Sequence, residues 1–457
     1  MSQTQPPAGG DRYPRQIFFI VGNEAAERFS FYGMTSILTL YMVENLGFAE
    51  NVAKARFHFF TFAVYMMPLL GGWLADRFFG RYRIILWVSF LYLAGHGVLA
   101  VWDGPWGLLA GCSLIAVGAG GIKPCVSAFV GDQFSKEQAH LLERAYGWFY
   151  FAINAGSIGG QFLIDPIRVA YGPALAFGVP GLAMALAVAI YIGGHKLYVK
   201  VAASGPDPNS FAKVLVGSGF DLKRADEKFP AAAVNGVRAT SRIFLVFLPV
   251  IAFWSLFYQY GSSWVLQAKA MRPLVIGTWT STPAQISTLN SIFVLALIPL
   301  MNRLYATLER RGVKVSPLRK MAFGMFVTPL SFVAAALVEM SITGGGTPHV
   351  GWQAIQYFFI SLGEVLVSVT ALEFAYTQAP PSMKSTIMSL WFVVIGTGSL
   401  LTGVVAELNR FTGPTFYWFF TALQLAAAVI FTAVAVWYRP ALTETSVRTD
   451  HPAGSAA

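Results

Sequence analysis

Residues 17–43 read IFFIVGNEAAERFSFYGMTSILTLYMV, a largely apolar run whose only charged side chains are Glu24, Glu27 and Arg28. A helix needs about 20 apolar residues to cross the hydrocarbon core of a bilayer, so this run is long enough to span a membrane. It is too long and too charged for the apolar region of a cleavable signal peptide, and we expect it to be retained. The stretch therefore predicts a transmembrane helix that carries ionisable groups.

The whole chain has the composition of a membrane protein. Its 457 residues are 55% hydrophobic and 12% charged, with a mean hydropathy of +0.57. Soluble domains carry about 25% charged residues, so a surface that faces only water cannot account for this composition. The 38 Phe, 18 Tyr and 12 Trp fit helices that pack in lipid and anchor at its interfaces. We therefore predict an all-α protein with the lipid bilayer as its solvent.

Eleven further apolar runs follow the first, which gives twelve predicted transmembrane helices. They are 17–43, 57–75, 82–102, 107–130, 145–164, 172–196, 242–261, 284–305, 318–340, 352–377, 386–406 and 414–438. A long polar stretch divides them into two groups of six. We expect five parts, namely a cytoplasmic segment 1–16, a six-helix bundle 17–196, a cytoplasmic linker 197–241, a second bundle 242–438 and a disordered cytoplasmic tail 439–457.

The positive charges predict the orientation. With both termini inside, the cytoplasmic segments and the span ends next to them hold 24 of the 32 Lys and Arg residues, and two more, Arg28 and Lys123, lie deep within spans. The outer loops then hold only six: Lys54, Arg56, Arg168, Lys269, Arg272 and Arg410. Because basic loops stay on the cytoplasmic side, we expect a multi-pass protein of the cell (inner) membrane with both termini cytoplasmic. The basic residues lie between apolar runs and form no patch with aromatic residues, so the net charge of +10 does not indicate a nucleic-acid partner.

Ionisable residues inside spans are costly and usually functional. Glu24, Glu27 and Arg28 share one helical face, because residues three and four apart are neighbours on a helix. Two carboxylates beside one guanidinium form a site that can take up or release a proton. The alternative is an ion cluster with a purely structural role.

Two further charges lie deep in their spans. Lys123 needs an anionic partner, either the first-span acids or a substrate carboxylate, unless it snorkels to an interface. Glu364 has no basic neighbour on its own helix, and Ser368, four residues on, is a candidate hydrogen-bond donor. The alternative for Glu364 is a protonated side chain buried by packing. A cavity with a cationic and an anionic wall would suit a short zwitterion such as a peptide.

Other chemistry-bearing residues are few. His58, near the outer end of its span, is a candidate for proton coupling, although a lone histidine is more often a packing residue. The two cysteines, Cys112 and Cys125, imply no disulfide framework. The chain has no HExxH motif and no paired aspartates within its spans, so we expect neither a metal site nor an enzyme.

Four stretches resemble signatures of the proton-coupled oligopeptide transporter (POT) family of the major facilitator superfamily. Residues 24–33 (EAAERFSFYG) are similar to the family's ExxERFxYYG motif, and residues 72–83 (GWLADRFFGRYR) resemble the cytoplasmic loop motif of the superfamily. Residues 120–129 (GGIKPCVSAF) and 149–157 (FYFAINAGS) look like two other family signatures. This resemblance implies the major facilitator fold, with twelve transmembrane helices in two six-helix bundles around a central site.

The resemblance also implies a function, the symport of protons with di- and tripeptides into the cell by alternating access. It implies no cofactor, with protons as the coupling ion. The implied proton-coupling residues are Glu24, Glu27, Arg28, Glu364 and His58. The implied substrate-binding residues are Arg28, Lys123, Tyr32, Tyr65, Tyr150, Asn154, Trp254, Phe257, Asn290, Glu364, Ser368 and Trp391, and the implied gating residues are Asp76 and Arg77. The alternative is a family member that moves nitrate or another small solute.

Three positions depart from the family pattern. Phe31 replaces the first tyrosine of the YYG motif, Thr35 stands where many relatives carry arginine, and Tyr258 stands where many carry an acid. The resemblance therefore implies that an outer salt bridge described for relatives is absent from this chain.

Overall fold

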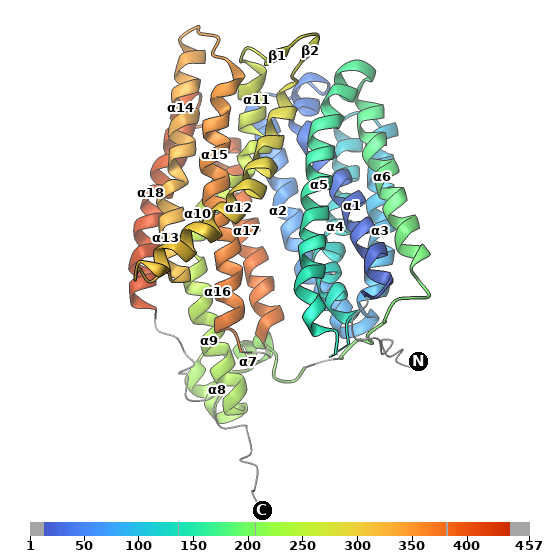
Figure 1. Cartoon of the computed structure of the whole chain (residues 1–457), viewed down its shortest axis with the longest axis vertical. Coiled ribbons are helices and arrows are strands. Elements are labelled where there is room, and N and C mark those ends of the chain that lie inside the picture. The colour runs from blue at the N-terminus through green and yellow to red at the C-terminus, as the bar shows by residue number, and fades with distance from the viewer. Residues whose placement is uncertain (1–12, 136, 206, 381–382, 439–457) are drawn as a thin grey trace, which may run out of the picture.

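The first half of the chain forms six long helices (Figure 1). In this computed structural model, residues 13–135, 137–205, 207–380 and 383–438 are described, so the expected tail 439–457 and most of the expected segment 1–16 lie outside them. The helices are α1 Gln16–Glu44, α2 Glu50–Leu74, α3 Arg81–Val101, α4 Pro105–Asp132, α5 Ala139–Tyr171 and α6 Pro173–Gly193. A π-helical turn, η1 Ala75–Phe79, extends α2.

The second half repeats the plan with more broken helices. Its first span is bent by 50° and consists of α9 Ala231–Phe247, α10 Val250–Phe257, the turn η2 Tyr258–Gly261 and α11 Ser263–Lys269. A hairpin of β1 Val275–Ile276 and β2 Trp279–Thr280 follows. The later elements are η3 Pro283–Ser287, α12 Thr288–Arg310, α13 Pro317–Val327, α14 Pro329–Thr343, η4 Val350–Trp352, α15 Gln353–Glu364, the π-helical turn η5 Val365–Val369, α16 Thr370–Gln378, α17 Lys384–Leu408 and α18 Pro414–Trp437.

Gly-Pro pairs start three of the helices. Gly104, Gly172 and Gly413 each have a positive φ and directly precede the first residue of α4, α6 and α18. Glycine adopts this backbone conformation without strain, and the fixed φ of proline suits the first helical position. These pairs turn the chain back into the membrane at the end of the molecule where the β1–β2 hairpin lies, which we call the hairpin end (top of Figure 1).

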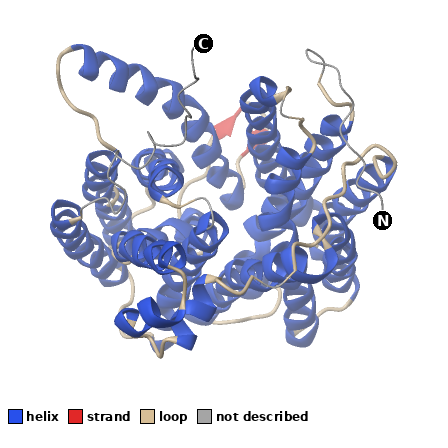
Figure 2. Ribbon diagram, turned by 90° about the horizontal axis from the view of Figure 1, so that it is seen from below, coloured by secondary structure: helices blue, strands red, loops and turns tan. Residues whose placement is uncertain are grey.

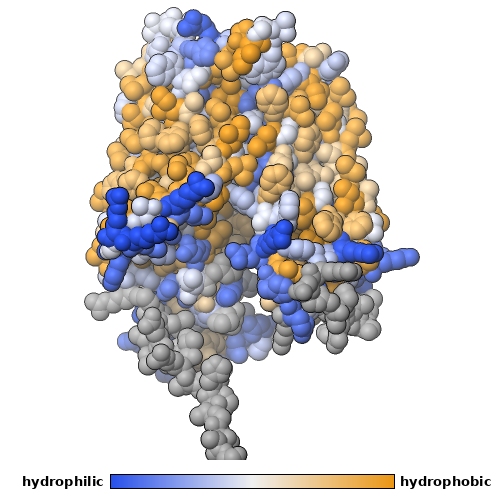
Figure 3. Space-filling model, in the orientation of Figure 1, coloured by the Kyte–Doolittle hydropathy of each residue, from blue (hydrophilic) through white to orange (hydrophobic). Residues whose placement is uncertain are grey.

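The helices account for the predicted membrane spans. Among the described residues nine helices are long and apolar enough to cross a membrane, or ten if the bent pair counts as one span. Helices α1 and α5, of 29 and 33 residues, are long enough to cross as well but carry more polar side chains. Each of the twelve predicted runs falls on one of these helices or broken helices. Apolar side chains cover the flanks of the molecule (Figure 3), as a protein surrounded by lipid requires.

The expected linker 197–241 is partly helical. Two short helices, α7 Phe211–Gly217 and α8 Leu222–Lys228, lie at the opposite end of the molecule, which we call the linker end. Their side chains Val214 and Ala225 pack with Val234 of α9 in a small hydrophobic cluster. Helix α9 begins at Ala231, before the predicted seventh span 242–261, and its first turns pack against these two helices.

Glycines bring α5 against the charged part of α1. A Cβ on Gly156 would lie 2.4 Å from the carbonyl oxygen of Ala25, and one on Gly160 would lie 2.5 Å from that of Phe29. Side chains larger than a hydrogen atom do not fit there, so the two backbones approach closely. This contact fixes the helical face that carries the first-span charges.

The two halves meet mainly at the hairpin end. Viewed from the linker end, the helices form two groups (Figure 2). The hydrogen bonds and ion pairs that we find between the halves involve residues from the middle of the membrane region to the hairpin end. The space between the halves is hollowed toward the linker end (Figure 3). The molecule is thus closed at the hairpin end and open at the linker end.

Candidate functional site

The predicted charge cluster of α1 forms as the helical spacing requires. Arg28 Nε lies 2.6 Å from Glu24 Oε1 and 3.2 Å from Glu27 Oε2. Both carboxylates are fully buried, whereas the guanidinium side chain is 12% exposed. Arg28 therefore pairs with two buried acids at once, and part of its side chain remains exposed.

The two acids keep unused hydrogen-bonding capacity. Glu24 Oε2 and both carboxylate oxygens of Glu27 make no hydrogen bond within the described part of the chain. The buried Tyr92 of α3 interacts electrostatically with Glu27, and His96, one turn further, bonds through Nε2 to the Ser30 hydroxyl at 2.8 Å. Sequence reasoning did not assign Tyr92 to this site, because only the packing of α3 on α1 brings it there. A buried charge without its full set of partners is costly, which favours uptake of a proton by the pair of acids.

Lys123 has aromatic neighbours, and the first-span acids, one of the two partners suggested by the sequence, do not pair with it. Its Nζ lies 4.2 Å from the ring centroid of Phe31 and 4.3 Å from that of Tyr65. Both first-span acids pair with Arg28 instead. Cation–π contacts with two ring faces thus hold an ammonium group that forms no ion pair with any described residue.

Glu364 of α15 is hydrogen-bonded by a residue of another helix. Asn290 of α12 donates from Nδ2 to Glu364 Oε2 at 3.0 Å and to the Ser361 hydroxyl at 3.0 Å. The suggested donor Ser368 lies beyond the start of the π-helical turn η5, and the structure records Asn290 as the hydrogen-bond partner of Glu364. Asn290 therefore orients the half-buried Glu364. Residue spacing within one helix does not reveal this contact, because it joins two helices.

The site spans both halves of the molecule. The carboxylate of Glu364 interacts electrostatically with the phenols of Tyr32 and Tyr65 of the first half. Arg28 interacts with the same two phenols. The two tyrosines are therefore within electrostatic range of both Arg28 of the first half and Glu364 of the second.

Most of the remaining predicted aromatic residues line the second half. Trp254 packs edge-on against Phe257, with ring centroids 5.2 Å apart, and against Trp391 at 5.8 Å. In the first half, Tyr150 is partly exposed, and its carbonyl accepts a hydrogen bond of 2.9 Å from Asn154 Nδ2. Trp254, Phe257 and Trp391 therefore form a packed aromatic cluster within the second half.

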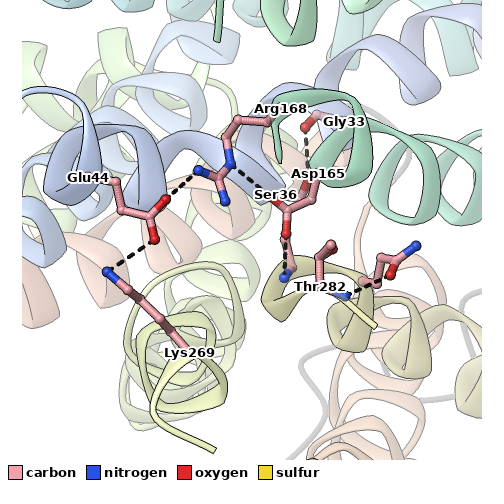
Figure 4. A network of polar contacts seen from close by, with 9 residues as sticks. Gly33, Ser36, Glu44, Asp165, Arg168, Lys269 and Thr282 are labelled. Carbon is pink, nitrogen blue, oxygen red and sulfur yellow. Dashed lines mark hydrogen bonds and ion pairs between the residues drawn. The ribbon is translucent and has the colours of Figure 1, made fainter. Parts of the chain in front are cut away.

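A polar network closes the hairpin end of the site (Figure 4). Arg168 of α5 bonds through Nε to Asp165 at 2.7 Å and also pairs with Glu44 at the end of α1. The other half contributes Lys269, whose Nζ lies 3.1 Å from Glu44, and the backbone N–H of Ala284, 3.1 Å from Asp165 Oδ2. This network was not predicted, since its members come from four separate segments of the sequence.

Two more contacts join the halves nearer the middle. His58 bonds through Nε2 to the Ser262 hydroxyl at 2.9 Å, and its Nδ1 has no hydrogen-bond partner among the described residues. The hydroxyl of Tyr258 donates to that of Tyr65. That the outer salt bridge is absent at Thr35 and Tyr258 remains a prediction. Tyr258 nevertheless joins the two halves through its hydrogen bond to Tyr65.

The predicted gating residues lie at the linker end and have different partners. Asp76 lies 3.6 Å from Arg81, which also bonds to Asp132 of α4 at 2.7 Å. Arg77 lies over the rings of Trp73 and Phe78. Asp76 therefore belongs to an ion cluster that ties α2, α3 and α4 together, while Arg77 packs on aromatic surface.

Comparison with known proteins gives consistent results. The sequence model of the POT family matches residues 82–225 and 223–419. Solute carrier family 15 member 2 of Rattus norvegicus is 38% identical over 404 residues, which cover 81% of this chain and 55% of the relative. The chain thus spans about half the length of the curated relatives it matches.

Two solved structures are similar over almost their full length. The POT family transporter PepTSo matches with a TM-score of 0.87 at 36% identity, over 93% of this chain and 98% of that one. An auto-inhibited POT family peptide transporter matches with a TM-score of 0.87 at 35% identity, over 96% of this chain and 99% of that one. These similarities confirm the predicted fold.

Proposed function

This chain belongs to the POT family, and from that membership and the charges of its site we propose that it carries di- and tripeptides across the cell membrane together with protons by alternating access. The observation that carries the proposal is the opposition of charges across the two halves. Arg28 and Lys123 belong to the first half, and Glu364, which has no cationic partner among the described residues, belongs to the second. A short peptide has the complementary charges at its two ends.

The proposed binding mode assigns one wall to each end of the peptide. Arg28 and Lys123 receive the terminal carboxylate, and Glu364 receives the terminal ammonium group. Charge-assisted hydrogen bonds of this kind are about twice as strong as neutral ones. The amides of Asn154 and Asn290 are available to the peptide backbone, and the aromatic side chains around Trp254 line the space for peptide side chains.

Proton coupling is assigned to the acids of the site. A proton on Glu24 or Glu27 lowers the cost of a buried carboxylate when its partner Arg28 turns to the substrate. Glu364, which has no cationic partner among the described residues, is a further candidate proton carrier. A peptide carboxylate that binds Arg28 competes with the two α1 acids for the same guanidinium group. Peptide and proton then stabilise each other in the site, which is the requirement for symport. His58 is a further candidate at the contact with Ser262.

Alternating access follows from the contacts between the halves. We place the linker end in the cytoplasm, because the predicted cytoplasmic segments carry 24 of the 32 basic residues. The structure then corresponds to the inward-open state. Opening outward requires the network around Arg168 to separate and the linker end to close, with the Asp76 cluster at the moving helix ends.

The driving force of one proton is sufficient for uptake. One charge moving across about 100 mV contributes about 2.3 kcal/mol, and one pH unit contributes about 1.4 kcal/mol. Together they sustain an accumulation of roughly several hundredfold. A single coupled proton therefore supports useful concentration of a peptide.

Uptake by the purified protein in liposomes tests this function. An acidic exterior should drive accumulation of labelled dialanine, and a protonophore should abolish that accumulation. Unlabelled di- and tripeptides should compete, and nitrate should not. Uptake that ignores the pH gradient would contradict the coupling, and competition by nitrate in the absence of competition by peptides would favour a carrier of small anions.

A further inference from the structure

The ammonium group of Lys123 is held between two aromatic rings. Its Nζ lies 4.2 Å from the ring centroid of Phe31 on α1 and 4.3 Å from that of Tyr65 on α2. The residue is half-buried, so the two rings do not enclose it completely. The two rings thus form an open cage, with one side left for a ligand.

The backbone fixes this position. A Cβ on Gly120 would lie 2.1 Å from the Cβ of Met67, so α4 presses directly against α2 one turn before Lys123. Pro124, which follows Lys123, restricts the backbone at the same point. The lysine therefore leaves α4 beside the face of α2 that carries Tyr65.

The ring faces take the place of a counter-ion. The acids on α1 are already paired with Arg28, and Glu364 is bonded to Asn290. A buried ammonium group without any partner would be costly. The negative faces of two aromatic rings stabilise a cation, and they do so more weakly than a carboxylate does. A carboxylate that enters the open side of the cage is therefore bound with little competition from the protein.

We propose that Phe31 and Tyr65 are positioning residues that hold Lys123 in its charged form, aimed at the space between the halves, until a peptide carboxylate binds. This inference rests on the proposed function and names the source of its selectivity for a free carboxyl terminus. It also gives a role to Phe31, which departs from the tyrosine of the family motif: the ring face is the part that acts, and a phenylalanine provides it without a hydroxyl group.

Two pairs of variants separate the ring faces from other effects. Phe31→Leu and Tyr65→Leu remove a ring face, whereas Phe31→Tyr and Tyr65→Phe keep it. Tyr65→Phe also removes the hydroxyl that bonds to Tyr258, so it isolates that contact. Phe392→Leu is a packing control, because the ring of Phe392 on α17 packs against that of Tyr65, with ring centroids 6.2 Å apart.

The first measurement is equilibrium binding of dialanine and of its C-terminal amide. We expect the leucine variants to weaken the free peptide by about threefold to thirtyfold, the range of a partly to fully desolvated cation–π contact, and to weaken the amide less. Phe31→Tyr and Phe392→Leu should retain the wild-type preference for the free peptide. Tyr65→Phe should keep more of that preference than Tyr65→Leu, because its ring face remains. Phe31→Leu in a Lys123→Ala background should change that preference no further, because Phe31 acts through Lys123. Equal weakening of both peptides would assign Phe31 to packing and overturn the proposal.

The second measurement uses no peptide and therefore stays informative if the proposed substrate is wrong. An amine-acylating reagent is added to the purified protein, and modification of Lys123 is followed by mass spectrometry. A caged, charged ammonium group reacts slowly, so both leucine variants should be acylated faster than the wild type, while Phe31→Tyr and Tyr65→Phe react at the wild-type rate. Equal rates in all variants would show that no cage exists, whatever the protein transports.

Discussion

The backbone N–H of Ala284 donates a hydrogen bond of 3.1 Å to the carboxylate of Asp165 and so joins the two halves at the hairpin end. Asp165 is fully buried and also accepts from Arg168, so it bonds to both halves at once. Lys269, the other contributor from the second half, is 44% exposed in its pair with Glu44. Burial therefore makes Asp165 the stronger of the two connections, since exposed ion pairs contribute about 0–1 kcal/mol.

Asp165→Ala should shift the molecule toward the state that is open at the hairpin end. Loss of a buried acceptor leaves the Ala284 N–H without a partner, which costs about 1–3 kcal/mol in the closed state only. The population ratio of the two states should change by about fivefold to a hundredfold. The distance between spin labels attached to Gly277 and to Tyr171, on opposite halves at this end, measures the change.

Lys269→Ala is the matched control for Asp165→Ala. Its effect on the same distance distribution should be smaller than threefold and should disappear at high salt, because salt screens an exposed pair. A larger shift for Lys269→Ala than for Asp165→Ala would show that the exposed pair, and not the buried carboxylate, holds this end closed.

Orientation is open to direct measurement. We expect the linker end to face the cytoplasm, because the loops on that side carry most of the basic residues. Single cysteines that replace Asp207 in the linker should resist an impermeant thiol reagent in intact cells, and a cysteine at Gly277 in the hairpin should react. The native Cys112 and Cys125 are buried and contribute little background. Reaction at position 207 without reaction at position 277 would show that the orientation is the opposite of the predicted one.

Glu27→Gln should separate exchange from accumulation. The substitution keeps the shape of the side chain and leaves Arg28 paired with Glu24 alone. Accumulation of dialanine driven by a pH gradient should be lost, whereas counterflow of labelled against unlabelled peptide should survive at least in part, because exchange needs no net proton movement. Normal accumulation by the variant would remove Glu27 from the coupling mechanism.

The sequence predicted the elements of this molecule better than their contacts. The spans are predictable because the bilayer sets a minimum length for each apolar run. The pairing of Arg28 with both acids is predictable because it depends only on helical spacing. Helix α9 extends beyond its apolar run and begins at Ala231, where Val214 packs with Val234. The length of an apolar run does not predict such an extension.

Contacts between helices were not predictable from one sequence. Charge alone predicts a carboxylate partner for Lys123. The close approach of α4 to α2 at Gly120 instead places its ammonium group over aromatic rings. Asn290 reaches Glu364 across 74 residues of sequence, and Asp165 reaches Ala284 across 119. Each of these contacts depends on how two helices pack, which composition and periodicity do not contain.

The last prediction concerns Glu364 and the amino end of the peptide. Asn290 is its one side-chain hydrogen-bond donor among the described residues, so the carboxylate is oriented but not neutralised by the protein. Glu364→Gln should weaken equilibrium binding of free dialanine strongly, because truncating one member of a desolvated charge pair costs about 2–5 kcal/mol. It should hardly weaken N-acetyl dialanine, because that peptide has no ammonium group for either the wild type or the variant to bind.

Glu373→Gln is the matched control: that acid is 53% exposed and pairs with Lys320 outside the site, so both peptides should bind as they do to the wild type. Equilibrium binding is required because Glu364 is also a candidate proton carrier, and uptake would mix the two roles. If Glu364→Gln weakens the free and the acetylated peptide equally, the carboxylate does not hold the amino terminus, and its bond to Asn290 serves to pack α12 against α15.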